Sequence, residues 1–482
     1  MTLLAIDQGT TSTKAFLLHP DGLFETIGAR KHAQFHPAEG LVEHDAEELA
    51  ANIEALIDVG LAAASDLAGI VIANQGETVI AWDRRTKKPL HRAIVWQDQR
   101  TQPDLETWSE TDRNTVRTRA GLPLDAYFSA SKLAWLLKNV PAVAEAARGG
   151  WLGLGTSDAF FLDRLTGTCA TDATTASRTS LMNLSTGAWD ETLCRLFDVP
   201  MSLLPPIRPT TGAFGTVRRG GRTIPIVASV VDQQAALFGH GCRAAGDAKV
   251  TFGTGSFALV LTGATPVLDR EGLSPTLAWQ LGDSPPVYAL EGGDYTAAAA
   301  VDWALSLGLG TSLDDFNLPA GPSALERDIV FVPALAGLAA PHWDRAAAGL
   351  FFGLRQDTSA ADMRRAVLEG VALRAVDLVE ALGLSEGAAL SVDGGMTRNV
   401  GFVAFLADAL GRNVVLRDHA DLTGLGAAEL GMIGLGRPLP PREAGCDRVI
   451  TPSARSAAIR AHRPRFAEAI ALSRRWGASG NA

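Results

Sequence analysis

The chain begins with an apolar run that ends at a carboxylate and is followed by a glycine and a cluster of hydroxyl side chains. Residues 3–6 are Leu-Leu-Ala-Ile, and residues 7–13 are Asp-Gln-Gly-Thr-Thr-Ser-Thr. This order predicts a strand, a tight polar turn and a returning strand. The glycine lets backbone N–H groups approach an anion closely, and the hydroxyls of Thr10, Thr11 and Ser12 can donate to it. Taken alone, the segment fits a phosphate-binding hairpin or an ordinary glycine turn equally well.

The carboxylate at the end of the first run adds a metal hypothesis. Asp7 would stand at the rim of the turn. Magnesium prefers oxygen ligands and keeps several of its waters, so a carboxylate in this place can hold a magnesium-bound water.

Two further glycine turns follow strand-like runs later in the chain. Residues 249–260, Lys-Val-Thr-Phe-Gly-Thr-Gly-Ser-Phe-Ala-Leu-Val, repeat the first pattern about half a chain away. A third turn at residues 394–399 follows the run 390–393, and apolar residues at helical spacing come after it. One such turn is weak evidence, but three predict two related halves that bind one nucleotide.

Composition excludes several classes of function. The 482 residues suffice for two or three domains, and a hydrophobic fraction of 47% can fill large cores. The formal net charge of -10, without a basic block among aromatic residues, argues against nucleic acid as a partner. No apolar run reaches the roughly 18 residues of a membrane helix, and the N-terminus leads directly into a strand. We therefore expect no membrane association and no signal peptide.

The cysteines and histidines do not form a metal motif in the sequence. Cys169, Cys194, Cys242 and Cys446 are widely spaced, which fits the reducing conditions of a cytoplasmic protein. His32, His36 and His44 lie in a polar stretch, where solvated histidines are commoner than metal ligands.

Alternating strand and helix patterns predict the α/β class. We expect a helix from Ala46 to about Leu67, buried strands at 69–74 and 224–231, a short strand at 93–96, a helix that begins at 131 and a surface helix over 454–476. Residues 240–246 separate the two hairpin-containing halves. The predicted domains are therefore residues 1–241 and residues 242–482.

With these segments in place, the chain resembles the FGGY family of carbohydrate kinases, and within it the glycerol kinases. The resemblance rests on ordered motifs that run from about residue 3 to residue 436. They are Asp-Gln-Gly-Thr-Thr-Ser at 7–12, Gly-Leu-Val-Glu-His-Asp at 40–45, Asn-Gln-Gly-Glu-Thr at 74–78, Ile-Val-Trp-Gln-Asp at 94–98, Ala-Ser-Arg-Thr at 176–179, Asp-Gln-Gln-Ala-Ala-Leu-Phe-Gly at 232–239, Phe-Gly-Thr-Gly at 252–255 and Asp-Gly-Gly at 393–395.

The resemblance implies a two-domain, ribonuclease-H-like fold of the actin-like ATPase type, with a nucleotide in the cleft between the domains. Such kinases transfer the γ-phosphoryl group of ATP to a substrate hydroxyl with Mg²⁺. Positions matching the family's nucleotide site are Thr10, Thr11, Ser12, Lys14, Thr254, Ala298, Gly395 and Asn399. Ala298 and the nearby Asp302 depart from the glycine and glutamine that glycerol kinases carry there.

The acceptor side follows from the same resemblance. Asp232 matches the catalytic base, although a carboxylate before a helix can also be a simple N-cap. Residues matching the substrate pocket are Gly76, Glu77, Trp96, Tyr127, Asp232 and Gln233.

Gly76 is the main departure, because glycerol kinases usually carry an arginine immediately before this glutamate. Three explanations stay open: glycerol bound more weakly, a longer polyol or ketose in the freed space, or another side chain in place of the arginine. Glycerol is the best single acceptor, with a kinase of xylitol, erythritol, xylulose or ribulose as the alternative. An actin-like ATPase or sensor without a phosphorylated product is more remote. Related kinases suggest a homo-oligomer, either a dimer or a tetramer.

Overall fold

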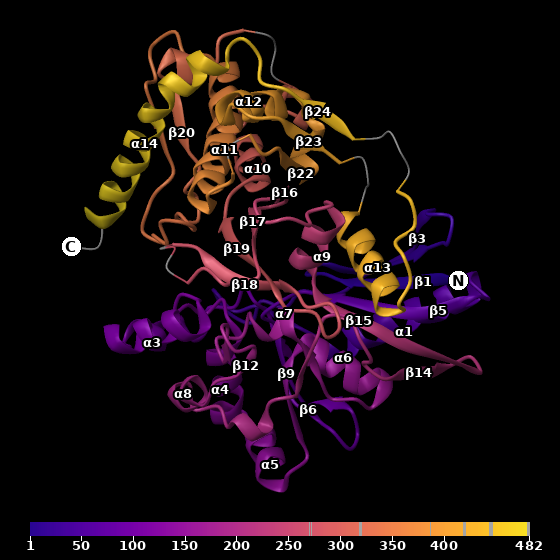
Figure 1. The fold of residues 1–482 in the computed structure, drawn as a ribbon. Coiled ribbons are helices and arrows are strands. Elements are labelled where there is room, and N and C mark those ends of the chain that lie inside the picture. The colour runs from indigo at the N-terminus through magenta and orange to yellow at the C-terminus, as the bar shows by residue number, and fades with distance from the viewer. Residues whose placement is uncertain are drawn as a thin grey trace.

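The computed structural model of the chain consists of two lobes, each built around one large sheet. It describes residues 1–268, 270, 272–317, 321–385, 387–417, 421–442 and 447–479, so Cys446 lies outside the described residues. In Figure 1 most elements of the second half of the chain lie above those of the first half.

The first sheet has the strand order β14 (Thr216–Arg219), β15 (Arg222–Val231), β5 (Leu67–Asn74), β1 (Thr2–Gln8), β2 (Ser12–Leu18) and β3 (Phe24–Lys31). Strands β1, β2 and β3 are antiparallel neighbours, whereas β5 and β15 continue parallel to β1. The predicted first hairpin is confirmed. Its turn closes where the Gly9 N–H donates to the Ser12 carbonyl at 3.0 Å.

The second sheet repeats this arrangement. Its order is β18 (Ser274–Trp279), β19 (Val287–Asp294), β17 (Ser256–Gly263), β16 (Ala248–Phe252), β22 (Leu390–Gly394), β23 (Val414–Leu416) and β24 (Arg448–Ile450). Strand β16 pairs antiparallel with β17 and parallel with β22, as β1 pairs with β2 and β5. The two halves predicted from the glycine turns therefore share one topology, and the two-domain α/β fold is confirmed.

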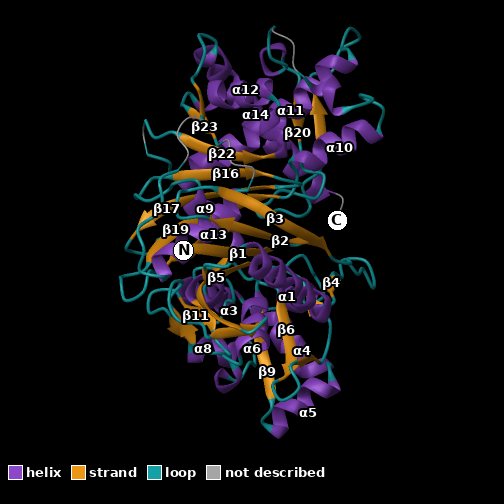
Figure 2. Cartoon of the chain, turned by 90° about the vertical axis from the view of Figure 1, so that its right-hand side faces the viewer, coloured by secondary structure: helices purple, strands orange, loops and turns teal. Residues whose placement is uncertain are grey.

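Helices cover both faces of each sheet, and two of them lie between the sheets (Figure 2). Helix α1 (Ala46–Ala63) packs on one face of the first sheet through Leu49, Ile53 and Leu56. Helices α9 (Asp232–Gly239) and α13 (Leu422–Gly434) join the inner faces of both sheets in one apolar cluster.

Helices α9 and α13 cross at very short range because both carry glycine at the contact. A Cβ on Gly426 would lie 1.9 Å from the Ala235 carbonyl oxygen, and one on Gly239 would lie 2.0 Å from the Leu422 carbonyl oxygen. No larger residue fits at either position without a shift of backbone.

A third, smaller sheet extends the first lobe and shapes the site. It consists of β4 (Glu43–His44), β8 (Ala93–Ile94), β6 (Val79–Asp83), β7 (Lys88–Pro89) and β9 (Leu152–Thr156). The helices of this lobe are α2 (Gln102–Glu106), α3 (Glu110–Ala120), α4 (Ser129–Asn139), α5 (Pro141–Gly149), α6 (Ser157–Thr166), α7 (Ala173–Ala176) and α8 (Glu191–Leu196). Two short strand pairs complete it, β10 (Thr171–Asp172) with β13 (Ile207–Arg208) and β11 (Met182–Asn183) with β12 (Ala188–Trp189).

In the second lobe the core lies between its sheet and a layer of helices. These are α10 (Ala298–Ser306), α11 (Ala360–Leu382), α12 (Val400–Leu410) and α14 (Ser456–Ser479), joined by the strand pair β20 (Val330–Val332) and β21 (Leu350–Phe352). None of the helices in the described ranges is long and apolar enough to cross a membrane.

Most predicted elements are present, with shifted ends. Helix α1 ends at Ala63 instead of about Leu67 because β5 already begins at Leu67, and β8 stops at Ile94 so that the next residues turn into the site. Helix α4 begins two residues before the predicted start at 131, and α14 begins at Ser456. The division between residues 241 and 242 stays a prediction, and α13 of the second half packs on the first sheet.

Candidate functional site

A cavity of about 140 Å³ opens at the carboxyl ends of β5 and β15. Parallel strands commonly present ligand-binding residues at this edge. Its walls bring together all six residues predicted for the acceptor side, and it is lined by Thr10, Gln75, Gly76, Glu77, Trp96, Tyr127, Arg178, Val231, Asp232, Gln233, Phe257 and Glu291. We call it the acceptor cavity.

Glu77 lines the acceptor cavity with its carboxyl group and has an unusual backbone conformation. It follows β5 with φ of 59°, in the left-handed region that non-glycine residues rarely adopt. Its carboxylate accepts from Arg178 Nε at 2.6 Å, and Arg178 Nη2 donates to Glu291 of β19 at 3.0 Å. Burial raises the pKa of Glu77 to about 7, against the lowering influence of the guanidinium.

Asp232 stands at the first position of α9, directly after β15. Burial raises its pKa to about 6, while the N–H that Gln233 donates to its Oδ1 at 2.6 Å lowers it. The side chain is half-buried and faces the acceptor cavity, so it can accept a proton from a ligand there. The neighbouring Gln233 is fixed by Lys249, a fully buried lysine whose Nζ donates to Gln233 Oε1 at 2.6 Å.

The aromatic wall is also present. Trp96 and Tyr127 meet edge to face with ring centroids 5.5 Å apart, and Phe257 of the second lobe approaches Trp96 at 6.4 Å. Beside them, Val231 lies against position 76 and narrows the room expected there. A Cβ at position 76 would lie 3.2 Å from Val231 Cγ1, which is tighter than ordinary contact.

A second cavity, of about 500 Å³, adjoins the acceptor cavity and is bordered by both glycine hairpins. We call it the larger cavity because it exceeds the acceptor cavity in volume. Thr10 and Thr11 line it from the first hairpin, and Gly253, Thr254 and Gly255 line it from the second. Thr10, Trp96 and Gln233 border both cavities. Two turns of backbone N–H groups and hydroxyls facing one space suit a polyphosphate.

The predicted metal position fits a cation. Asp7 Oδ1 is buried without a hydrogen-bond partner, and burial together with Asp421 and Asp232 raises the pKa of Asp7 well above its ordinary value. Among the described residues no three His, Cys, Asp or Glu side chains are arranged to hold a metal. One carboxylate with phosphate oxygens and waters is a usual way to hold Mg²⁺, so Asp7 remains a suitable ligand.

Lys14 is engaged by a partner that the sequence did not suggest. Its Nζ lies 2.6 Å from Asp421 Oδ2, just before α13, and this pairing raises its pKa. The pair ties the first hairpin to the second half of the chain.

The remaining predicted nucleotide residues lie outside both cavities. Ser12 begins β2, and Ala298 donates its N–H to the Gly253 carbonyl at 3.1 Å, behind the second hairpin. Gly395 is exposed after β22, and Asn399 caps α12 by accepting from the Phe402 N–H at 3.0 Å. Their nucleotide roles stay predictions.

The expectation of solvated histidines is wrong for two of the three. His32 and His44 are buried and stack edge to face with centroids 4.7 Å apart, whereas His36 is exposed. Burial lowers the pKa of His32 and lowers that of His44 to about 3, so both rings are neutral near pH 7. They lie behind the turn at Thr10, whose backbone carbonyl accepts from His32 Nε2.

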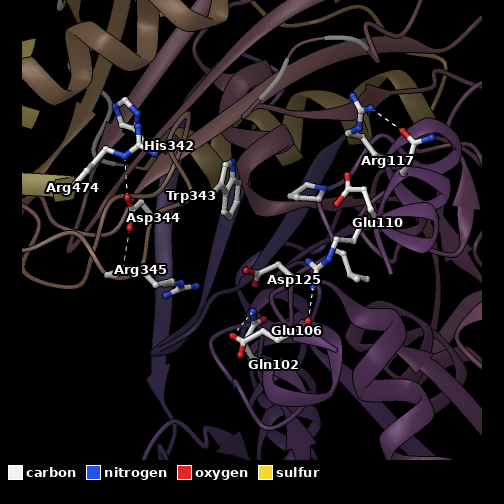
Figure 3. Close-up of a pocket in the computed structure, with 15 residues that line it drawn as sticks. Gln102, Glu106, Glu110, Arg117, Asp125, His342, Trp343, Asp344, Arg345 and Arg474 are labelled. Atoms are coloured by element: carbon white, nitrogen blue, oxygen red, sulfur yellow. Dashed lines mark hydrogen bonds and ion pairs between the residues drawn. The ribbon is translucent and has the colours of Figure 1, made fainter. Parts of the chain in front are cut away.

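A third cavity, about 580 Å³ in volume, adjoins the larger cavity and is lined by residues of both lobes (Figure 3). Glu106 and Asp125 lie on its first-lobe wall, and Arg345 and Arg474 lie on the opposite wall. Asp125, Trp343 and Arg345 also border the larger cavity, so the two cavities are neighbours.

Comparison with known proteins agrees with this geometry. The model of the N-terminal domain of the FGGY family of carbohydrate kinases matches residues 2–239, and the model of its C-terminal domain matches residues 248–435. This chain belongs to the FGGY family of carbohydrate kinases. It is therefore an ATP-dependent kinase.

Individual relatives within the FGGY family agree along nearly the whole chain. The glycerol kinase of Thermus brockianus is 44% identical over 447 residues, 90% of either chain, and that of Trichlorobacter lovleyi is 42% identical over 448 residues, again 90% of either chain. The crystal structure of Plasmodium falciparum glycerol kinase with ADP superimposes with a TM-score of 0.89 at 31% identity, covering 98% of both chains.

Three charged residues that hold the acceptor side in place were not predicted: Arg178, Glu291 and Lys249. Arg178 lies in the motif at 176–179, but nothing in its neighbourhood indicated that it reaches Glu77. Lys249 lies on β16, the first strand of the second hairpin, and Glu291 lies on β19 beside that hairpin. Each has uncharged residues on both sides in the sequence. A charged residue within a buried strand was the sequence feature that could have revealed them, because a buried charge needs a partner.

Proposed function

We propose that this protein transfers the γ-phosphoryl group of ATP to a hydroxyl of glycerol and releases glycerol 3-phosphate. The observation that carries the proposal is that the acceptor cavity and the larger cavity share Thr10, Trp96 and Gln233. An alcohol in the first and a polyphosphate in the second would meet at this shared boundary, beside Gln233 and next to Asp232.

The acceptor cavity suits a small polyol. Glu77 offers carboxylate oxygens to donor hydroxyls, and Trp96 and Tyr127 offer a flat surface to the carbon chain. The small volume of about 140 Å³, with Val231 lying against position 76, favours glycerol over the longer polyols and ketoses. Arg178 brings a buried guanidinium to the same wall and supports the explanation that another side chain replaces the expected arginine.

Asp232 is the proposed base. A hydroxyl that attacks phosphorus loses its proton, and a carboxylate with pKa of about 6 is ionised at neutral pH and still basic enough to accept it. General-base assistance is worth about 10²–10⁴-fold in rate.

On the nucleotide side the two hairpins would cradle the phosphates. Thr10, Thr11 and Thr254 offer hydroxyls, and the turn backbones offer N–H groups. Mg²⁺, which Asp7 would hold through one carboxylate, would neutralise charge on the phosphate oxygens. Lobe closure around both substrates would exclude water that could otherwise hydrolyse ATP.

A panel of acceptors tests the proposal. Release of ADP from ATP and Mg²⁺ is measured with glycerol, erythritol, xylitol, xylulose and ribulose, and we expect the highest kcat/KM with glycerol. A higher value for a longer acceptor would assign the enzyme to that substrate. If no acceptor changed the rate of ADP release, the protein would instead be an ATPase or sensor. The acceptor cavity argues against that outcome, because a pure ATPase needs no second substrate pocket.

Location and assembly stay predictions. The spacing of the cysteines favours a cytoplasmic protein, and related kinases favour a homo-oligomer. Size-exclusion chromatography with light scattering would establish the oligomeric state.

A further inference from the structure

Trp96 connects the two substrate cavities through one hydrogen bond. Its indole borders the acceptor cavity and the larger cavity, as does Thr10 at the tip of the first hairpin. Trp96 Nε1 donates to Thr10 Oγ1 at 3.1 Å, across 86 residues of sequence. Tyr127 and Phe257 pack against the indole from the first and the second lobe.

The direction of this hydrogen bond determines where the Thr10 proton points. An indole N–H can only donate, so the Thr10 hydroxyl must accept from Trp96. Its own O–H proton is then left to donate elsewhere. Thr10 also faces the cavity proposed for the phosphates, so the proton is available to a phosphate oxygen.

A second chain of hydrogen bonds fixes the backbone of the same residue. The Thr10 carbonyl accepts from Gln34 Nε2 at 2.7 Å and from His32 Nε2 at 2.8 Å. Because Gln34 Nε2 donates to that carbonyl, Gln34 Oε1 is free to accept, and it accepts from His44 Nε2 at 2.8 Å. His44 Nδ1 in turn accepts from Gln75 Nε2 at 3.3 Å. Gln75 lines the acceptor cavity, so this chain also runs from that cavity to the first hairpin.

We propose that Trp96 is a positioning residue that couples the two substrates, in addition to forming the wall of the acceptor cavity. The inference rests on the proposed function. An acceptor packed on the indole restricts the ring to the position from which its N–H reaches Thr10, and the oriented hydroxyl then binds phosphate better. Coupling of this kind is reciprocal, so bound nucleotide strengthens acceptor binding by the same factor.

Substitution of Trp96 by phenylalanine keeps an aromatic wall and removes the donor. Binding of the non-hydrolysable analogue adenylyl imidodiphosphate with Mg²⁺ is measured by calorimetry, with and without saturating glycerol. For the wild type, glycerol is expected to tighten binding. In Trp96→Phe the analogue should bind about 2- to 12-fold more weakly, as expected for one neutral hydrogen bond, and the effect of glycerol should disappear. Trp135→Phe, a tryptophan on α4 outside both cavities, is the matched control and should keep the wild-type coupling.

A double-mutant cycle with Thr10 separates this role from loss of packing. Thr10→Val keeps the shape and removes the hydroxyl. If Trp96 acts through that hydroxyl, Trp96→Phe has no further effect on analogue binding in the Thr10→Val background. An equal loss in both backgrounds, or coupling retained in Trp96→Phe, would overturn the proposal.

The cycle needs no acceptor, so it tests the contact between Trp96 and Thr10 even if glycerol proves not to be the substrate. In that case the proposed function fails on the acceptor panel, and the coupling measurement uses the acceptor of highest kcat/KM.

Discussion

Replacement of Asp232 by asparagine is expected to abolish most of the turnover and at the same time to stabilise the fold. The carboxyl has an ordinary pKa of 3.8 in the unfolded chain and about 6 in the folded protein. At pH 7 it is ionised in both states. A pKa difference of about two units then means that the charged carboxylate lowers the free energy of unfolding by up to about 3 kcal/mol. Because the side chain faces a cavity that water can enter, we expect a realised gain of about 1–3 kcal/mol for the neutral amide.

The sign of this effect depends on pH in a defined way. Between pH 4 and pH 6 the folded state retains a proton that the unfolded state has lost, so the destabilisation due to Asp232 grows as pH rises through this window. The stability gain of Asp232→Asn should therefore be full above about pH 6 and absent below about pH 4. Thermal unfolding of both proteins at several pH values measures it.

Turnover should move in the opposite direction. Loss of the base should lower kcat by about 10²–10⁴-fold while adenylyl imidodiphosphate binding is largely kept. Asp163→Asn serves as the control. This buried carboxylate of α6 accepts from Lys87 Nζ at 2.7 Å and from Trp82 Nε1 at 2.8 Å, far from the reacting groups. It should lower the unfolding temperature and leave kcat unchanged. Near-normal turnover in Asp232→Asn, or an unfolding temperature that falls at pH 7, would refute the reasoning.

Three further outcomes are expected. The kcat/KM for glycerol should fall as pH drops through about 7, where Glu77 takes up a proton, and more steeply below about 6, where Asp232 does so, and a pH–rate profile that stays flat to pH 5 would contradict this. Arg178→Met should destabilise the protein by about 3–5 kcal/mol in urea unfolding, because Glu77 loses its buried partner, and should raise the KM for glycerol more than that for ATP. Gly76→Arg should reduce kcat/KM for glycerol because its Cβ meets Val231, and adding Val231→Ala should restore part of that loss. If the double variant instead loses as much as the two single variants together, the two positions are independent.

Local patterns in the sequence were sufficient for the parts of the site that lie next to glycine turns and strand ends. The two hairpins and the placement of Asp232 follow from largely apolar runs that stop at polar residues or glycine, and all of these are present. Glu77 and Trp96 lie in the turns that follow strands β5 and β8, although their convergence on one cavity was known only through the family resemblance.

Contacts between distant segments could not be predicted in the same way. Arg178 reaches Glu77 across 101 residues, and only the assembled fold shows that the guanidinium is buried between two carboxylates. His32 and His44 were misjudged because a polar stretch of sequence reads as solvated, whereas these two rings are buried behind the first hairpin although most of the residues between them are exposed. Burial of polar groups depends on which segment covers them, and periodicity does not reveal that.

The position of α13 constrains how the chain can be made. The ribosome releases β1, β5 and β15 early, but part of their inner face is covered by residues 422–434, which are translated almost last. A nascent chain of the first lobe therefore emerges with Leu3 and Val71 lacking part of their native cover, and its folding can be completed only when synthesis is nearly finished. The two sequence halves are thus not independent units for co-translational folding, whichever boundary is drawn between them.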